Sequence, residues 1–158
     1  MKKAKDIMNI DIVSFSPDTS IFVAAEEFAK RKISGAPVVD KKGKIIGVIS
    51  ASDIIRFVDI KMSKLPMIYS PGISCLLLMF IQIEKGHIDF KSEMKKVSRT
   101  KVKDVMTRHI ITITPNASLL EISELIEKED VNRLPVVNKT GKIVGIVARA
   151  DVIRGIIS

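Results

Sequence analysis

The chain has 158 residues, enough for one compact domain or two small, mutually dependent halves. Hydrophobic residues make up 46% and charged residues 28%, which excludes a disordered chain; aromatics are only 4%, with no Trp, so aliphatic residues must build the core. The formal charge of +8 favours anionic partners such as nucleotides, nucleic acid or acidic proteins.

The single cysteine, Cys75, has no partner for an internal disulfide, which suits a reducing compartment. The first residues carry no long apolar run after their charges, so we expect no signal peptide. The most apolar stretch, residues 73–83, is about half the ~20 residues that a membrane-spanning helix needs. These features predict a soluble, cytoplasmic protein that does not bind a membrane.

The first half of the chain has the pattern of a strand, a helix, two strands and a second helix. Apolar alternation predicts the first strand, and Pro17 marks the turn after it. Apolar residues from Ile21 to Phe28 share one helical face, and Gly43 marks the turn between the next two strands. In order, these elements are expected at residues 12–15, 21–28, 36–39 and 45–49 and from residue 52 onwards.

Residues 59–99 separate the two halves. They include the apolar stretch 73–83, which fits either a strand paired with residues 87–90 or a helix at an interface. Because large apolar patches mark contacts, we expect this stretch to pack on the rest of the molecule or in a dimer interface. The lysines that follow it fit a solvated face or an anion-binding patch.

The second half repeats the first at a constant offset of 98 residues. Residues 101–154 align with residues 3–56 without a gap, and 20 of the 54 positions are identical. Ser118 and Glu121 have the spacing of a capping box at the start of a helix. The chain is therefore a duplicated unit of about 55 residues, with its second set of elements expected at 110–113, 119–126, 134–137, 143–147 and from 150 onwards.

Each repeat thus has the order β-α-β-β-α, and the fold class is α/β (α+β). One repeat alone is too small to cover both faces of its sheet. We expect two pseudo-twofold-related units packed through their sheets, with an inserted crossover segment. The expected domains are residues 1–58 and 100–158, joined by residues 59–99.

Several motifs recur in both repeats at fixed spacing. They are Asp-hydrophobic-Met at 6–8 and 104–106, Pro-Val-Val at 37–39 and 135–137, two glycines at 43/47 and 141/145, and Asp at 53 and 151. Together they resemble the signature of cystathionine-beta-synthase (CBS) domains over about two thirds of the chain. The resemblance implies a tandem pair, called a Bateman module. The cleft of such a pair holds up to two adenosine ligands, usually AMP, ADP or ATP, and two pairs commonly form a dimer.

Ser50, Ser52 and Asp53 lie where a strand passes into a helix. A helix N-terminus offers free N–H groups to phosphate, serine hydroxyls can add hydrogen bonds, and a carboxylate can accept two from a ribose diol. The resemblance assigns the ribose to Asp53 and places the serine near phosphate. Ordinary helix capping is the alternative, since Ser and Asp are preferred there.

The second repeat departs from this pattern, because alanines replace both serines. Asp151 remains available for a ribose. Arg149 can supply a guanidinium to phosphate or be an ordinary surface charge. Arg133 matches a position that often carries a phosphate-binding Arg in the family, although it also fits a solvated loop. We therefore expect two unequal sites.

The resemblance also implies an apolar slot for adenine in each site. One slot is expected from Met8, Val13, Ile33, Ser34 and Ala36, and the other from Met106, Ile111, Val131 and Leu134. Composition alone assigns the apolar members of both sets to the core.

No catalytic constellation is visible, because His87 and His109 lack metal-ligand spacing and neither glycine turn has P-loop spacing. We therefore expect no enzyme activity and no catalytic cofactor. The sequence predicts a sensor of AMP, ADP or ATP that forms a homodimer and signals to an unidentified protein partner by conformational change. The alternatives are a module for S-adenosylmethionine and a basic nucleic-acid-binding protein; for the latter we see no helix-turn-helix or zinc ligands.

Overall fold

The computed structural model describes residues 2–63 and 99–158. The predictions made for Cys75, His87 and residues 73–83 fall outside the described residues. In the part of the chain that is described, no helix is both long and apolar enough to cross a membrane.

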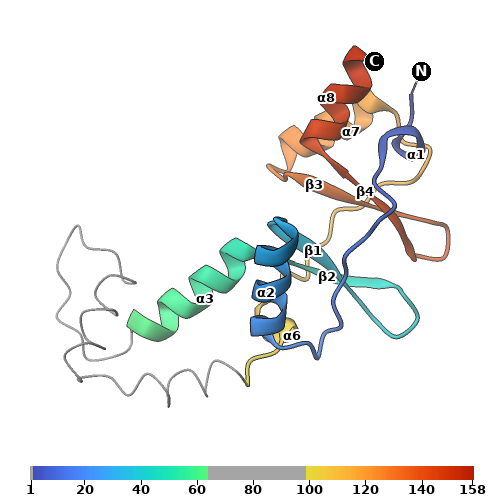
Figure 1. The fold of residues 1–158 in the computed structure, drawn as a ribbon. Helices are drawn as coiled ribbons and strands as arrows, with labels where there is room; N and C mark the ends of the chain where they lie inside the picture. Colours follow the sequence, from blue (N-terminus) through green and yellow to red (C-terminus); the bar gives the residue numbers. More distant parts are fainter. Residues whose placement is uncertain (1, 64–98) are drawn as a thin grey trace, which may run out of the picture. The chain divides into compact units, whose positions relative to one another are not determined.

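The described elements confirm a mixed α/β class with two small sheets (Figure 1). Strands β1 and β2 form one two-stranded sheet, and β3 and β4 form the other, which is antiparallel. The elements are α1 (Ala4–Ile7), α2 (Ile21–Arg31), β1 (Gly35–Val39), β2 (Ile45–Ser50), α3 (Ala51–Ser63), α6 (Val102–Val105), α7 (Leu119–Lys128), β3 (Arg133–Val137), β4 (Ile143–Ala148) and α8 (Arg149–Ile157).

Helices α2 and α7 begin where the sequence predicts. In α2, the Ser20 hydroxyl accepts a hydrogen bond from the Phe22 N–H at 3.3 Å. In α7, the predicted capping box is confirmed: the Ser118 N–H donates to the Glu121 carboxylate at 2.7 Å, and the Glu121 N–H donates to the Ser118 hydroxyl at 3.3 Å. These bonds satisfy N–H groups that have no partner inside the helix.

The strands predicted at residues 12–15 and 110–113 are wrong, because each shrinks to a single parallel bridge. In the first repeat Phe15 bridges Val38, with the Phe15 N–H donating to Pro37 and the Val39 N–H donating to Phe15. Extending this ladder in either direction requires an N–H from Pro37 or from Pro17, and proline has none. The second repeat has the same bridge and the same two prolines.

Two short helices, α1 and α6, were not expected from the sequence. Each carries the Asp of the Asp-hydrophobic-Met motif, whose carboxylate accepts from the N–H three residues earlier. Asp6 accepts from Lys3 at 2.8 Å and Asp104 accepts from Lys101 at 2.9 Å. The motif therefore has a local structural reason, because its aspartate caps a helix of one turn.

The chain forms two compact units, and each contains segments of both repeats. Unit 1 comprises Met1–Ser16, Ala36–Val48 and Thr107–Ser158, and unit 2 comprises Pro17–Gly35 and Ile49–Met106. In unit 1, the leading segment of the first repeat packs on the second repeat. The Ala4 N–H donates to the Ala117 carbonyl at 2.8 Å, and Asn9 and Ile146 exchange two main-chain hydrogen bonds at 2.8 and 2.9 Å.

Unit 2 contains the reciprocal contacts, because α6 packs on the first repeat. The Val102 N–H donates to the Thr19 carbonyl at 2.8 Å, and the Lys103 N–H donates to the Pro17 carbonyl at 3.0 Å. Each of these residues lies 98 positions from its counterpart in unit 1. The leading segment of each repeat therefore packs on the other repeat, so the two repeats depend on each other for folding.

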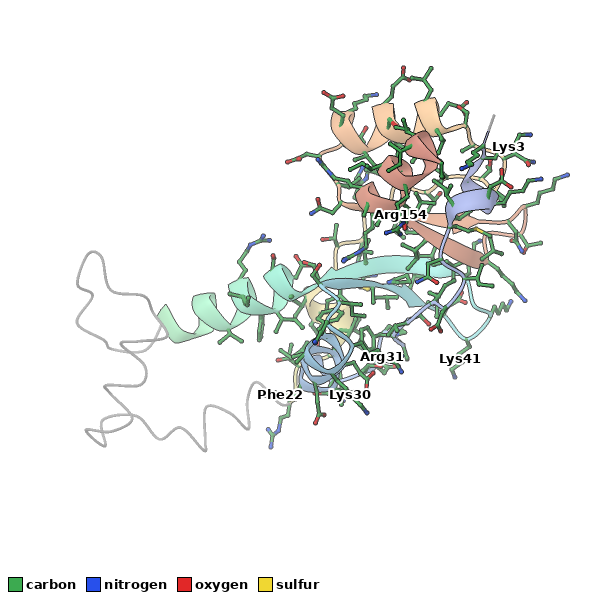
Figure 2. All side chains as sticks on the ribbon, turned by 45° about the horizontal axis from the view of Figure 1, so that its top comes forward. Lys3, Phe22, Lys30, Arg31, Lys41 and Arg154 are labelled. Carbon is green, nitrogen blue, oxygen red and sulfur yellow. The ribbon has the colours of Figure 1, made fainter. Side chains whose placement is uncertain are left out.

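The basic side chains that Figure 2 labels are spread over several elements. Lys30 and Arg31 lie at the end of α2, Lys41 lies in the β1–β2 turn, and Arg154 lies on α8. The Arg31 Nε lies 2.7 Å from a Glu27 carboxylate oxygen, and this hydrogen bond lowers the pKa of Glu27 below its usual value. Part of the basic excess is therefore neutralised locally.

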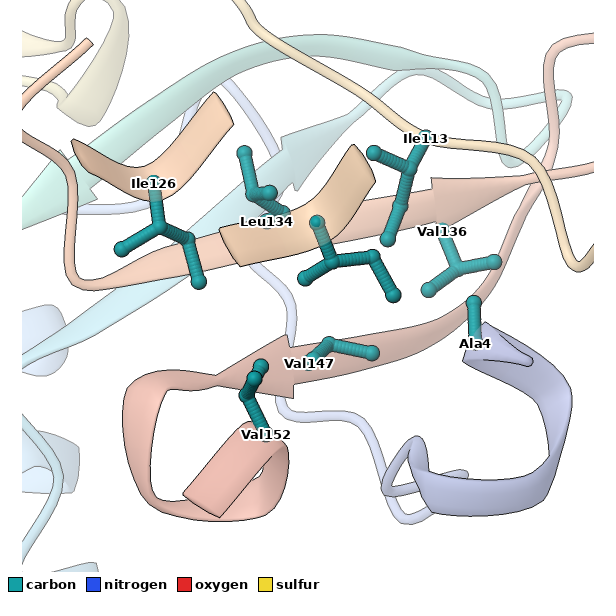
Figure 3. Packing of buried hydrophobic residues seen from close by; sticks show 8 residues of the cluster. Ala4, Ile113, Ile126, Leu134, Val136, Val147 and Val152 are labelled. Atoms are coloured by element: carbon teal, nitrogen blue, oxygen red, sulfur yellow. The ribbon is translucent and has the colours of Figure 1, made fainter. Parts of the chain in front are cut away.

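The core of unit 1 lies between β3, β4 and the helices that cover them (Figure 3). Three consecutive residues at the centre of β3 are buried, so both faces of this strand are covered. Burying a Val, Leu or Ile side chain stabilises a fold by about 1.5–3 kcal/mol. The members of this core are Ala4, Ile113, Ile122, Ile126, Leu134, Val136, Val147 and Val152.

Candidate functional site

The corner between β2 and α3 brings Ser50 and Asp53 together in unit 2. The Asp53 Oδ2 accepts two hydrogen bonds at 2.8 Å, one from the Ser50 N–H and one from its hydroxyl. The Asp53 N–H donates to the same hydroxyl at 3.2 Å. Ser50 therefore caps α3, which is the helix-capping interpretation of this motif. Its hydroxyl already donates to Asp53, so it must reorient before it donates to a phosphate.

The second carboxylate oxygen of Asp53 is held more loosely. Its Oδ1 lies 3.7 Å from Nη1 of Arg56, and the Asp53 side chain is 15% exposed. A carboxylate with one oxygen fixed by the main chain and the other near the surface is oriented to accept hydrogen bonds from a diol. Ser52 is exposed in the first turn of the same helix, and the Ser34 carbonyl accepts from the Ala51 N–H at 3.0 Å.

An apolar groove of about 320 Å³ lies next to this corner in unit 2. It runs between α2 and α3, and within residues 2–63 and 99–158 each residue that lines it is apolar, including Phe28, Ile33, Ala51 and Ile54. Its volume falls at the low end of the range for small-molecule sites, roughly 300–1,000 Å³. Ile33 is the residue that this groove shares with the predicted adenine slot.

The equivalent corner between β4 and α8 lies in unit 1 and has different partners. The Asp151 Oδ2 accepts from the Ala148 N–H at 2.7 Å, and its Oδ1 is paired closely with Arg154. The Asp151 side chain is 13% exposed. Because the second repeat has no serine hydroxyl here, the main chain and an arginine hold this carboxylate among the described residues.

Arg149 and Arg133 both lie near the second corner. The Arg149 Nε donates to the Val131 carbonyl at 3.2 Å, and its Nη2 lies 3.5 Å from Oδ1 of Asp130. Arg133 begins β3 opposite Ala148 in the antiparallel register and is partly buried. Arg133 and Arg149 thus begin two elements that meet at this corner, but the Arg149 guanidinium is turned towards the loop before β3.

The predicted adenine-slot residues fall into three structural settings. Ala36, Met106 and Leu134 are buried. Met8, Ile111 and Val131 are partly buried and pack against the core of unit 1. Val13 is partly buried and Ser34 is exposed. The structure gives the apolar members packing roles, and their contact with a ligand stays a prediction.

The two units divide the predicted site residues between them. Unit 2 contains Ile33, Ser34, Ser50, Ser52, Asp53 and Met106, whereas unit 1 contains Met8, Val13, Ala36, Ile111, Val131, Arg133, Leu134, Arg149 and Asp151. Sequence reasoning missed Asp130, the partner of Arg149. It also missed the arginine three residues after each site aspartate, although this Asp-x-x-Arg spacing recurs in both repeats and is typical of a helical ion pair.

Comparisons with known proteins agree with the duplicated pattern. A family model for the CBS domain matches residues 4–60 and again residues 102–158. An uncharacterised protein of Methanocaldococcus jannaschii, MJ1426, is 36% identical over 156 residues, which is 97% of this chain and 90% of that protein. Inosine-5'-monophosphate dehydrogenase of Aquifex aeolicus is 30% identical over 154 residues, but the match covers only 24% of that enzyme.

Solved structures with the same fold cover nearly the whole chain. The crystal structure of Arabidopsis thaliana CBSX2 in complex with AMP has a TM-score of 0.69 at 24% identity, covering 99% of this chain and 97% of that one. The CBS domain pair of MJ0100 in complex with 5'-methylthioadenosine and S-adenosyl-L-methionine has a TM-score of 0.68 at 21% identity, covering 99% and 96%. The chain therefore belongs to the CBS domain family and carries two CBS domains in tandem.

Proposed function

We propose that this chain is a regulatory module that binds an adenine nucleotide, AMP, ADP or ATP, at the Ser50–Asp53 corner. The observation that carries the proposal is the fixed, partly exposed Asp53 carboxylate next to an apolar groove. A ribose diol suits the carboxylate, and a flat ring suits the groove. Complexes of CBSX2 with AMP and of MJ0100 with S-adenosyl-L-methionine support an adenosine ligand.

The proposed roles follow the two corners. Asp53 and Asp151 accept hydrogen bonds from ribose, while Ser50, Ser52, Arg133 and Arg149 approach phosphate. The predicted apolar residues contact adenine. The first corner is the stronger candidate because it has both serines and the adjoining groove, whereas Asp151 is already paired with Arg154.

The remaining parts of the proposal concern the whole protein. The two CBS repeats comprise residues 1–58 and 100–158. The protein acts in the cytoplasm and catalyses no reaction. It forms a homodimer. Ligand binding shifts the two repeats relative to each other, and a partner protein detects that change. S-adenosylmethionine remains the alternative ligand, because the features that suit a ribose and adenine suit it equally.

Isothermal titration calorimetry tests the proposal with AMP, ADP, ATP and S-adenosylmethionine. We expect binding of at least one of them and a loss of roughly tenfold or more in affinity for Asp53→Asn, since hydrogen bonds to a charged group contribute ~1.5–3 kcal/mol. Removing a negative charge alone strengthens binding of an anion, so weaker binding identifies the ribose contact.

Glu127→Gln is the matched control, because it removes one exposed negative charge from α7, which belongs to unit 1 and not to the unit that holds this corner. It should leave the affinity unchanged, and thermal melts of both variants establish that they fold. No heat with any of the four compounds, or equal affinity in wild type and Asp53→Asn, contradicts the proposal.

A further inference from the structure

Ala51 and Arg149 occupy the same position in the two repeats, as the first residues of α3 and α8. Their main chains are held alike: the Ala51 N–H donates to the Ser34 carbonyl at 3.0 Å, and the Arg149 N–H donates to the Asn132 carbonyl at 3.2 Å. The two corners therefore share this main-chain hydrogen bond, and besides the two serines they differ in the side chain at the first helical position.

In the first repeat this position leaves a hollow. Ala51 and Ile33 both line the apolar groove of unit 2, and a methyl group at position 51 fills little of it. The residue before Ile33 is Lys32, which adopts a left-handed backbone conformation with φ 54° at the end of α2.

In the second repeat the long side chain of Arg149 contacts the counterparts of two residues from the first repeat, Ile33 and Lys32. The Arg149 side chain reaches from the start of α8 to the carbonyl of Val131, the counterpart of Ile33. Its far end lies 3.5 Å from Asp130, the counterpart of Lys32, which has a similar φ of 49°. Asp130 thus attracts the Arg149 guanidinium in the second repeat. In the first repeat the residue at that place is Lys32, whose charge would repel an arginine at position 51.

The contact that holds Arg149 is open to competition. The Arg149 side chain is 48% exposed and the Asp130 side chain is fully exposed, so water and salt screen their attraction. A phosphate group offers the guanidinium two or three oxygens and a charge, and it binds arginine more strongly than a single exposed carboxylate does. Adenosine offers no such anion.

We propose that Arg149 makes the second repeat selective: it covers the counterpart of the groove and admits adenosine ligands only when a phosphate draws it away from Asp130 and Val131. This selectivity rests on the proposed nucleotide-binding function and adds a specificity-determining residue to it. The first repeat, with Ala51, admits adenosine and its phosphates alike.

Calorimetric titrations of adenosine and of AMP into wild type and Arg149→Ala test the selectivity. Wild type should bind one adenosine and two AMP per chain. Arg149→Ala should bind two adenosines, while its second AMP binds roughly tenfold more weakly because a charged hydrogen-bond partner is gone. Simple loss of a positive charge cannot increase the binding of neutral adenosine, so the gain is diagnostic.

Two further variants complete the design. Ala51→Arg combined with Lys32→Asp transfers the arginine and its acidic partner to the first repeat, and it should abolish adenosine binding while AMP still binds. Lys128→Ala removes an exposed positive charge from α7 and should change nothing. Melting curves establish that each variant is folded.

The outcomes separate the two proposals. If wild type binds AMP and Arg149→Ala still takes up one adenosine, the selectivity is wrong and nucleotide binding stands. Two adenosines bound to wild type also overturn the selectivity. If wild type binds neither compound, the selectivity fails; nucleotide binding fails with it when ADP, ATP and S-adenosylmethionine also give no heat.

Discussion

Replacing Gly145 by Ala tests whether the leading segment of the first repeat packs on the second. A Cβ at this position on β4 comes within 2.8 Å of the Met8 Cγ and 3.1 Å of the Met8 Cβ. Favourable carbon–carbon contacts lie at ~3.5–4.0 Å, so something must move. The main chain of Met8 cannot move away easily, because its N–H donates to the Ala4 carbonyl and the next residue, Asn9, exchanges main-chain hydrogen bonds with Ile146.

We expect Gly145→Ala to lower the free energy of unfolding by about 1–3 kcal/mol, the usual cost of overpacking a core. For a chain of this size each kcal/mol lowers Tm by about 2–4 °C. Met8→Ala removes the atoms beyond Cβ, so the penalty of Gly145→Ala should be smaller in the double variant.

The assay is a double-mutant cycle measured by thermal and urea unfolding followed by circular dichroism. Contact between the two side chains predicts a coupling free energy of at least ~0.5 kcal/mol. If the two substitutions are additive, or if Gly145→Ala leaves Tm unchanged, Met8 does not pack on β4 and the reciprocal exchange of leading segments is refuted.

Two further predictions concern the helix caps. Ser50→Ala should cost about 1 kcal/mol of stability through the lost N-cap, seen as a lower Tm, and an unchanged Tm contradicts the capping role of the hydroxyl. In α7, bonds from Ser118 hold the pKa of Glu121 below its usual value, so this group adds stability above its unfolded pKa and loses it as pH falls through its folded pKa. Ser118→Ala keeps the main-chain N–H bond to Glu121 but removes the hydroxyl bond, so it should raise the pKa of Glu121, measured by NMR titration of the carboxyl carbon; no rise contradicts the hydroxyl bond.

The sequence predicted the elements that depend on local patterns. The capping box at Ser118 and the buried stripe of α2 follow from spacing alone, and both are present. The first strand of each repeat was overestimated because the alternation of residues 12–15 is real, but the prolines on either side of the bridge prevent a ladder. Because Pro17 and Pro37 have no N–H to donate, the sequence itself predicts a single bridge here and not a strand.

The exchanged leading segments could not be predicted from local patterns. Ala4 packs with residues more than 100 positions away, and a one-turn helix with two apolar and two charged residues carries no signal of which repeat it packs on. The Arg149 contact was equally hidden, because it depends on the side-chain conformation and on the left-handed backbone at Asp130. The duplicated spacing identified the position, and only the structure showed the direction in which the arginine points.

An NMR titration of the isotope-labelled protein with AMP tests the proposed site most directly. We predict that amide signals from Ser50 to Asp53 and of Ile33 shift with a common dissociation constant, and that in Asp53→Asn the same shifts need roughly tenfold or more AMP. Saturating AMP that leaves the Ser50–Asp53 amides unmoved, or that shifts only signals of exposed lysines elsewhere, contradicts the account.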